Sequence, residues 1–450
     1  MKMETAKSLI LIVLIGISLL LTFGLWSYQP ELPEKSDKPP LNEAVNLGGK
    51  DNEKKGTVIE PREVIFHMDD LHYGFSKPIK KQEFYEQIQT WSISNLQTRL
   101  VSGRTPNKNE VEVIFPSNLP MEILNNLMSL SDSNTELPNW SFDRMYLSFN
   151  PDSKSLNLEI LSIDGRNEAT AIINDSNHYE FLWDYFQSVD EGLLQEYLSL
   201  EQTKEPIYIP RDSVSVTKQS YTSESIDEPN LLIKVFFPDP SLVSQTYSSA
   251  GDTYYTDSQR GMRVYWKRGR MEFVDPYSED AVGDDQTAAN MLTNSIKNIN
   301  SHNGWTNEYN LMDINAKENV VRYQMYDDNG YPIYNALNLS YIDQKWINLQ
   351  LNEYDRPLFE LNVPLGGSTE KLMSGQDLIS YLNRNYNLEN FQDIRIGYRL
   401  IYHYDEDESS MSGSNYKDRI IELIPAWFKK ENGEWNEIDL NEDQLLKGGD

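Results

Sequence analysis

The densest group of side chains that could carry chemistry is the run His67-Met68-Asp69-Asp70-Leu71-His72. It offers two imidazoles and two carboxylates, which are enough donors for a divalent metal ion. On a strand, His67 and Asp69 would share one face. Asp70 and His72 would share the other, so the four donors converge only in a loop. The spacing matches no established ligand pattern, and the run predicts a strand end with a solvated turn; a metal site is the alternative.

The rest of the sequence offers few candidates for catalysis. The acidic run YDEDE at 404–408 lacks the alternating oxygen ligands and central glycine of a calcium loop, so it predicts a solvated hairpin tip. No H-E-x-x-H, G-x-S-x-G, G-x-G-x-x-G or Walker motif occurs. Two of the 70 Asp and Glu residues could still form the catalytic pair of a glycosidase, although nothing in the sequence points to such a pair. We predict that the protein is not an enzyme and has no catalytic residue, cofactor or metal site.

Aromatic residues are abundant, with 27 tyrosines and 9 tryptophans. They could floor a groove for cell-wall glycans, but β-rich domains also use such residues in cores and cross-strand pairs. We expect mainly core packing. An anchored protein that binds or hydrolyses the cell wall is the alternative function.

Composition limits the partners. The chain has no cysteine, so disulfides, thiolate nucleophiles and cysteine metal sites are excluded. Lys+Arg 40 against Asp+Glu 70 gives a formal net charge of -30, which repels nucleic acids, teichoic acids and anionic lipid heads. We therefore expect protein partners and no nucleic acid, unless the acidic surface serves only solubility.

The segment Ser8–Trp26 has no charged residue and is predicted to cross a membrane. Roughly 19 residues at about 1.5 Å each reach about 28 Å, close to the thickness of a hydrocarbon core. Lysines precede the segment and glutamates follow it, so residues 1–7 should be cytoplasmic and everything after Tyr28 extracellular. A cleaved signal peptide is the alternative, but the small-residue cleavage site is missing. We expect an uncleaved, single-pass anchor at 8–27 in the cell membrane.

Six side chains recur along this helix at 3–4–3–4–3 spacing, which aligns them on one seam for contact with another helix. They are Ser8, Leu11, Ile15, Ser18, Thr22 and Leu25. The hydroxyls of Ser18 and Thr22 would bond a partner helix or, alternatively, the i−4 carbonyls of their own helix. The predicted partner-helix contact therefore comprises Leu11, Ile15, Ser18, Thr22 and Leu25, and a homodimer stays open.

Beyond the anchor, composition predicts a flexible linker at 28–57, rich in proline, glycine and charge. A first α+β domain at 58–212 should open with a strand in VIEPREVIFHM and a helix around Gln82 to Leu96. Strands at VEVIF, MYLSF, LNLEIL and ATAII should then form an antiparallel meander. Asp175 should cap a helix whose aromatic face packs on that sheet.

The middle domain, 213–330, should begin with strands at SVSVTKQSY, NLLIKVFF, MRVYWK and MEFVD, the last two joined by a tight turn at KRG. A helix capped by Asp284 and Asp285 should follow. The C-terminal domain, 331–450, repeats a helix, GQDLISYLNRNY, and then antiparallel strands. The pattern predicts an α+β fold of antiparallel sheets with packed helices throughout.

A juxtamembrane pattern, L-T-x-x-x-W-x-Y-x-P, ends the apolar helix. It is formed by Leu21, Thr22, Trp26, Tyr28 and Pro30. With the basic head and the acidic, cysteine-free ectodomain, it resembles the YycH family, which regulates the WalK–WalR (YycG–YycF) two-component system of Firmicutes. The resemblance covers the chain in length and layout, and it implies three ectodomain domains, the last two similar to the companion protein YycI.

The same resemblance implies no catalytic residues and a complex with YycI and the sensor histidine kinase WalK, held largely by transmembrane helices. Such a complex would tune kinase output and, through it, cell-wall homeostasis. The resemblance leaves the sign of regulation open. A membrane-anchored regulator of signal transduction in a Gram-positive cell is therefore the predicted function.

Overall fold

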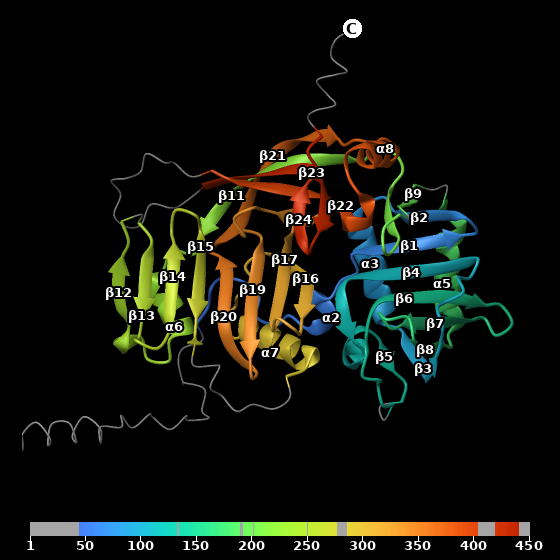
Figure 1. The fold of residues 1–450 in the computed structure, drawn as a ribbon, viewed down its shortest axis with the longest axis horizontal. Coiled ribbons are helices and arrows are strands. Elements are labelled where there is room, and N and C mark those ends of the chain that lie inside the picture. Colours follow the sequence, from blue (N-terminus) through green and yellow to red (C-terminus); the bar gives the residue numbers. More distant parts are fainter. Residues whose placement is uncertain are drawn as a thin grey trace, which may run out of the picture. The chain divides into compact units, whose positions relative to one another are not determined.

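Three sheets, antiparallel for the most part, dominate the computed structural model, with a few helices packed against them (Figure 1). The structure describes residues 45–132, 135–189, 192–200, 202–249, 251–276, 286–403 and 419–440. These residues belong to one unit that begins at Val45. The predicted α+β class is confirmed.

The first sheet has ten strands in the order β10-β9-β2-β1-β4-β6-β7-β8-β3-β5. All neighbours are antiparallel except β3 and β5. The predicted meander is confirmed, because β4, β6, β7 and β8 are adjacent. The strands are β1 Glu63–Met68, β2 Leu71–Phe75, β3 Ser92–Leu100, β4 Asn109–Pro120, β5 Ser129–Leu130, β6 Ser141–Asn150, β7 Ser155–Leu161, β8 Asn167–Ile173, β9 Leu194–Leu200 and β10 Ile207–Pro210.

Helices α3 (Pro78–Gln89) and α5 (Ser176–Gln187) cover one face of this sheet. The ring of Phe66 lies 5.5 Å from that of Phe84 on α3 and 5.6 Å from that of Phe186 on α5. Asp175 caps α5 as predicted, since its side chain accepts a hydrogen bond from the backbone N of Asn177 at 2.8 Å.

The second sheet has eight antiparallel strands in the order β12-β13-β14-β15-β20-β19-β17-β16. Helices α6 (Pro229–Phe236) and α7 (Ala288–Asn300) pack on one face, where Phe236 lies 5.3 Å from Tyr354 and Ser295 is hydrogen-bonded to Tyr323 at 2.7 Å. The strands are β12 Ser244–Tyr247, β13 Thr253–Thr256, β14 Gly261–Tyr265, β15 Arg270–Val274, β16 Glu308–Asn315, β17 Val320–Tyr326, β19 Tyr341–Ile347 and β20 Gln350–Pro357.

The third sheet has six strands in the order β18-β22-β23-β11-β21, with β24 also paired to β23. Helix α8 (Gly375–Asn385) buries Leu378 and Leu382 in a cluster that includes Ile209 of the first sheet and Trp427 of the third. The strands are β11 Ser215–Ser225, β18 Ile333–Tyr334, β21 Phe359–Lys371, β22 Phe391–Tyr402, β23 Arg419–Glu431 and β24 Glu434–Glu437. Short helices complete the described residues: α2 Lys55–Val58, α4 Leu124–Leu127, and the 3₁₀ turns Met121–Ile123, Pro240–Leu242 and Leu388–Asn390.

Two predicted elements are wrong. The helix expected around Gln82 to Leu96 starts earlier, at Pro78, and ends at Gln89, and the chain then forms β3 on β8. The run NLLIKVFF is not a strand but α6, which starts at Pro229. Proline is favoured in the first helical turn, and a short apolar run alone fits either a buried strand or a buried helix.

The linker prediction also needs correction. Leu47 is buried and its backbone N donates to the carbonyl oxygen of His302 at 3.0 Å. Gly49 lies so close to Trp305 that a Cβ there would fall 2.2 Å from the Trp305 carbonyl oxygen. Residues 45–57 are therefore docked rather than flexible. Local composition could not show this, because the backbone hydrogen bonds go to the segment after α7, about 250 residues further along the chain.

Of the other predictions, some stay untested and one is wrong. The domain boundaries at 212 and 330 remain predictions, and the second and third sheets both take strands from each side of residue 330. The span Ser8–Trp26 and the run 404–408 lie outside the described residues. The cap expected at Asp284 and Asp285 is wrong, because α7 begins at Ala288 and its N-cap is Thr287, whose side chain accepts a hydrogen bond from the backbone N of Asn290. Among the residues that the structure describes, no helix is both long and apolar enough to cross a membrane.

Candidate functional site

A cluster of buried and partly buried charged side chains lies where the ten-stranded sheet meets the six-stranded one, and we call it the ionic seam. Its members are Arg62, Glu63, Lys81, Asp393 and Arg395. Asp393 is central, since its carboxylate oxygens lie 2.7 Å from Arg62 Nη1 and 2.6 Å from Arg395 Nε. Arg62 therefore joins the start of β1 to β22 through this carboxylate, which Arg395 of the same strand shares.

Electrostatics in the ionic seam follow from burial and pairing. Burial opposes ionisation of Asp393, but the charges of Arg395 and Arg62 outweigh burial and lower its pKa below the usual range. Lys81 donates to the backbone oxygen of Arg62 at 2.6 Å, and burial lowers its pKa. Burial raises the pKa of Glu63. Charged side chains from three segments of the chain, at 62–63, 81 and 393–395, thus depend on one another for charge compensation.

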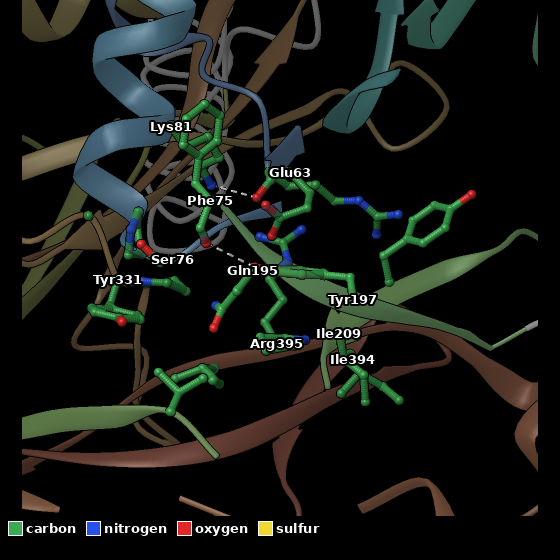
Figure 2. Close-up of a pocket in the computed structure, with 18 of the residues that line it drawn as sticks. Glu63, Phe75, Ser76, Lys81, Gln195, Tyr197, Ile209, Tyr331, Ile394 and Arg395 are labelled. Atoms are coloured by element: carbon green, nitrogen blue, oxygen red, sulfur yellow. Dashed lines mark hydrogen bonds between the residues drawn. The ribbon is translucent and has the colours of Figure 1, made fainter. Parts of the chain in front are cut away.

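A cavity of about 70 Å³ adjoins the ionic seam (Figure 2). Glu63, Lys81 and Arg395 line it together with β2, β9 and the turn at 330–332. Its volume has room for a few water molecules but is far smaller than that of a typical ligand pocket. The hydroxyl of Ser76, a lining residue, donates to the carbonyl oxygen of Gly192 at 3.0 Å. The arrangement can bind water and orient two sheets.

A second polar network lies on the face of β1 opposite Phe66. Successive residues alternate along a strand, so Ile65 and His67 lie on the other face from Phe66, which packs against aromatic rings of α3 and α5. His67 Nε2 lies 2.9 Å from Glu112 Oε2 on β4, and Glu112 is also paired with Arg144 on β6. Burial opposes ionisation of Glu112, but the hydrogen bond from His67 and the charge of Arg144 lower its pKa to about 2.

The structure brings His67 and His72 together, which the sequence analysis did not expect. A two-residue turn at Asp69 and Asp70 reverses the chain, so His67 pairs with His72 across β1 and β2. Their Nδ1 atoms lie 2.9 Å apart. The opposite faces that one continuous strand would give do not apply, because the run is a hairpin of two strands. The solvated turn is confirmed, since both aspartates are exposed.

Metal-ligand geometry is incomplete at this hairpin. In the part of the chain that the structure describes, no group of three or more His, Asp or Glu side chains is placed to hold a metal ion. The aspartates of the turn stay in solvent, and the Asp69 carboxylate lies 3.8 Å from the ammonium of Lys108. The two imidazoles therefore meet, but the two aspartate carboxylates do not join them.

The predicted partner-helix residues cannot be placed, since they lie outside the described residues. They are Leu11, Ile15, Ser18, Thr22 and Leu25. Sequence reasoning missed the ionic seam, although β22 carries a signal: in FQDIRIGY the charged Asp393 and Arg395 alternate with apolar residues. That pattern marks one polar face but does not say that this face becomes buried.

The fold and the ionic seam define an α+β protein of several antiparallel sheets joined by buried charges. Comparison with known families then narrows the class. A model described as the N-terminal domain of YycH protein matches residues 4–191, and one described as its C-terminal domain matches residues 204–444. The chain belongs to the YycH family.

Individual relatives agree with this assignment. A protein of Bacillus subtilis (strain 168), named two-component system WalR/WalK regulatory protein YycH, is 22% identical over 469 residues, covering 100% of this chain and 99% of the relative. The crystal structure of YycH from Bacillus subtilis matches with a TM-score of 0.69 at 18% identity, covering 87% of this chain and 99% of that one. At that identity the structural likeness shows a shared fold.

Proposed function

We propose that this protein is a membrane-anchored, extracytoplasmic regulator of a WalK-type sensor histidine kinase and so of cell-wall homeostasis. One observation carries the proposal: the chain matches, over its full length, a relative named as a regulatory protein of the WalR/WalK system. Both halves contribute, because the two family models together span residues 4–191 and 204–444.

The anchor in this proposal is the apolar segment Ser8–Trp26, with the N-terminus in the cytoplasm and the described unit outside the cell. The described unit begins at Val45, and Leu47 is already hydrogen-bonded to it. Only residues 28–44 are left as a tether. Fully extended, such a tether spans at most about 60 Å. The regulator would therefore act close to the membrane surface.

Contact with the kinase and with a YycI-type companion would be made largely by the anchor helix. Lipid removes the hydrophobic drive for helix association, so small side chains and interhelical hydrogen bonds must supply it, at about 0.6 and at most about 2 kcal/mol per bond. Ser18 and Thr22 are the polar members of the seam formed with Leu11, Ile15 and Leu25. Their hydroxyls are the expected specificity determinants.

Replacing both hydroxyls tests this contact. Ser18→Leu with Thr22→Leu keeps the segment apolar and should weaken association by about 1–3 kcal/mol, roughly 5- to 150-fold. The matched control is Val13→Leu with Leu20→Ile, which changes two residues away from the seam and should have no effect. Co-purification of the kinase from detergent and a reporter of its response regulator are the measurements.

A second experiment separates the anchor from the rest. Protein secreted without residues 1–27 should fail to restore normal reporter output in a strain that lacks this protein. Full restoration would place the regulatory contact outside the membrane. An unchanged reporter in the Ser18/Thr22 double variant would show that these two residues do not contact a partner helix. Retention on isolated peptidoglycan without kinase co-purification would favour the alternative, a wall-binding protein.

A further inference from the structure

The histidine hairpin has the spacing of a chelating nitrogen pair. Two imidazole nitrogens bound to one ion at about 2.0–2.1 Å are about 2.9 Å apart in adjacent positions of a square or octahedral set, and about 3.4 Å apart in a tetrahedral one. The Nδ1 atoms of His67 and His72 are 2.9 Å apart. The distance between the two nitrogens therefore fits a hydrogen bond and a cis-chelate equally well.

The Glu112 carboxylate orients His67 for ligation. Oε2 of Glu112 lies 2.9 Å from Nε2 of His67. The other ring nitrogen of His67, Nδ1, is the one that faces His72. A histidine whose second nitrogen is held by a carboxylate is the usual arrangement behind a metal ligand.

Surrounding groups hold both rings in place. Arg144 pairs with Oε1 of Glu112, the carboxylate oxygen that His67 does not contact. The ring of Tyr208 packs edge-on against both imidazoles, with centroids 5.6 Å from His67 and 5.1 Å from His72. His72 is half-buried and lies next to the exposed turn, so one end of the pair is near solvent.

We propose that His67 and His72 form a binding site for one divalent transition-metal ion, with Cu²⁺ preferred, through their two Nδ1 atoms. Water fills the other positions, because the described residues offer no third ligand. Cu²⁺ suits a square or tetragonal set of nitrogen and oxygen donors and lies at the top of the affinity order. The ion takes the place of the proton shared by the two Nδ1 atoms, and His72 then carries its own proton on Nε2.

The test uses the full-length protein in detergent, without a polyhistidine tag, titrated with CuCl₂. Wild type should bind one equivalent, with an electron paramagnetic resonance spectrum that shows coupling to two imidazole nitrogens. His72→Gln should lose one nitrogen and at least about tenfold in affinity while keeping a hydrogen-bonding side chain at the surface. Its melting temperature without copper reports that the fold is intact.

Two further variants make the result specific. His178→Gln is the matched control, because His178 is a half-buried histidine on α5 that stacks on Trp91 far along the chain from the hairpin; copper binding should not change. Glu112→Gln keeps His67 and His72 but removes the anionic hydrogen-bond acceptor, and should weaken binding by about 10- to 100-fold. Calcium should not compete, since it selects oxygen ligands.

Equal copper affinity in wild type and His72→Gln would overturn the proposal, and so would the absence of a stoichiometric, two-nitrogen signal in wild type. In either case the contact between the two rings is a hydrogen bond and nothing more. A rise in melting temperature with copper in wild type and the control, but not in His72→Gln, would support it.

Discussion

The two faces of β1 bury very different chemistry. On the helix side, Phe66 sits among aromatic rings of α3 and α5, 5.5 Å from Phe84. On the other side, the adjacent residue His67 is tied to Glu112, which is paired with Arg144. One strand thus separates a face stabilised by apolar area from a face that also buries charges, each of which depends on its partner.

This difference teaches how each face should respond to change. Apolar burial contributes roughly in proportion to area, so truncation costs stability wherever it falls. A buried ion pair contributes little net free energy, but removal of one partner leaves a desolvated charge. Stability should depend on side-chain volume at the helix-covered face of β1 and on charge balance at its other face.

The largest effect is expected on the apolar face. Phe66→Ala removes a fully buried ring and should lower the free energy of unfolding by about 3–5 kcal/mol, measured by urea denaturation. Leu100→Ala, in β3 of the same sheet but 83% exposed, should change it by less than about 0.5 kcal/mol. Similar losses in the two variants would contradict the assignment of the helix-covered face as the core.

The charged face should show a different pattern. Arg144→Met leaves Glu112 with His67 as its one strong partner and should cost about 3 kcal/mol. Adding Glu112→Met removes the orphaned charge, and the double variant should recover most of the loss. If the double variant is less stable than Arg144→Met alone, the pair contributes more than its desolvation costs and the comparison fails.

Glu60 sharpens the comparison, because it is a largely buried carboxylate for which the charge of Lys81 does not outweigh burial. Burial raises its pKa to about 7, opposite in direction to that of Glu112. The folded pKa is above the unfolded value, so ionisation of Glu60 reduces stability as pH rises from about 4.5 to about 7. Glu60→Gln keeps the acceptor for Asn310 and should raise stability by about 2 kcal/mol at pH 8.

The Glu60 gain should vanish at pH values near 4.5, where wild type is protonated as well. Unfolding measured in urea at several pH values gives the difference directly. A difference between Glu60→Gln and wild type that stays constant with pH would show that Glu60 does not titrate differently in the two states.

The smallest effect is expected for an ion pair in solvent. Lys345 and Glu353 lie 2.9 Å apart on β19 and β20, with side chains 35% and 50% exposed. Lys345→Ala should cost at most about 1 kcal/mol, and less at high salt. A loss as large as that of Arg144→Met would show that burial does not separate the two kinds of pair.

Much of the fold could be predicted from sequence, because local periodicity and capping chemistry act over a few residues. Alternation in VEVIF, MYLSF and LNLEIL predicted neighbouring strands that the structure has as β4, β6 and β7. The Asp175 cap and the apolar stripe of α7, with Met291 and Leu292 buried, also follow from adjacent residues. So does the class of the fold.

Other features were decided only by tertiary structure. NLLIKVFF has no preference strong enough to choose strand or helix, and packing on the eight-stranded sheet makes it α6. The ionic seam joins Arg62 to Asp393, more than 300 residues apart, and no local pattern records which distant charge will meet it. Composition and periodicity are properties of neighbours, whereas burial of a charge depends on what folds over it.

The histidine hairpin lies between these cases. The sequence determined which donors are present and that the turn between them would be solvated. Only the register of β1 on β2, fixed by the two-residue turn, decided that His67 and His72 face each other. A one-residue change in that turn would point the two rings to opposite sides of the sheet, since side chains alternate along a strand.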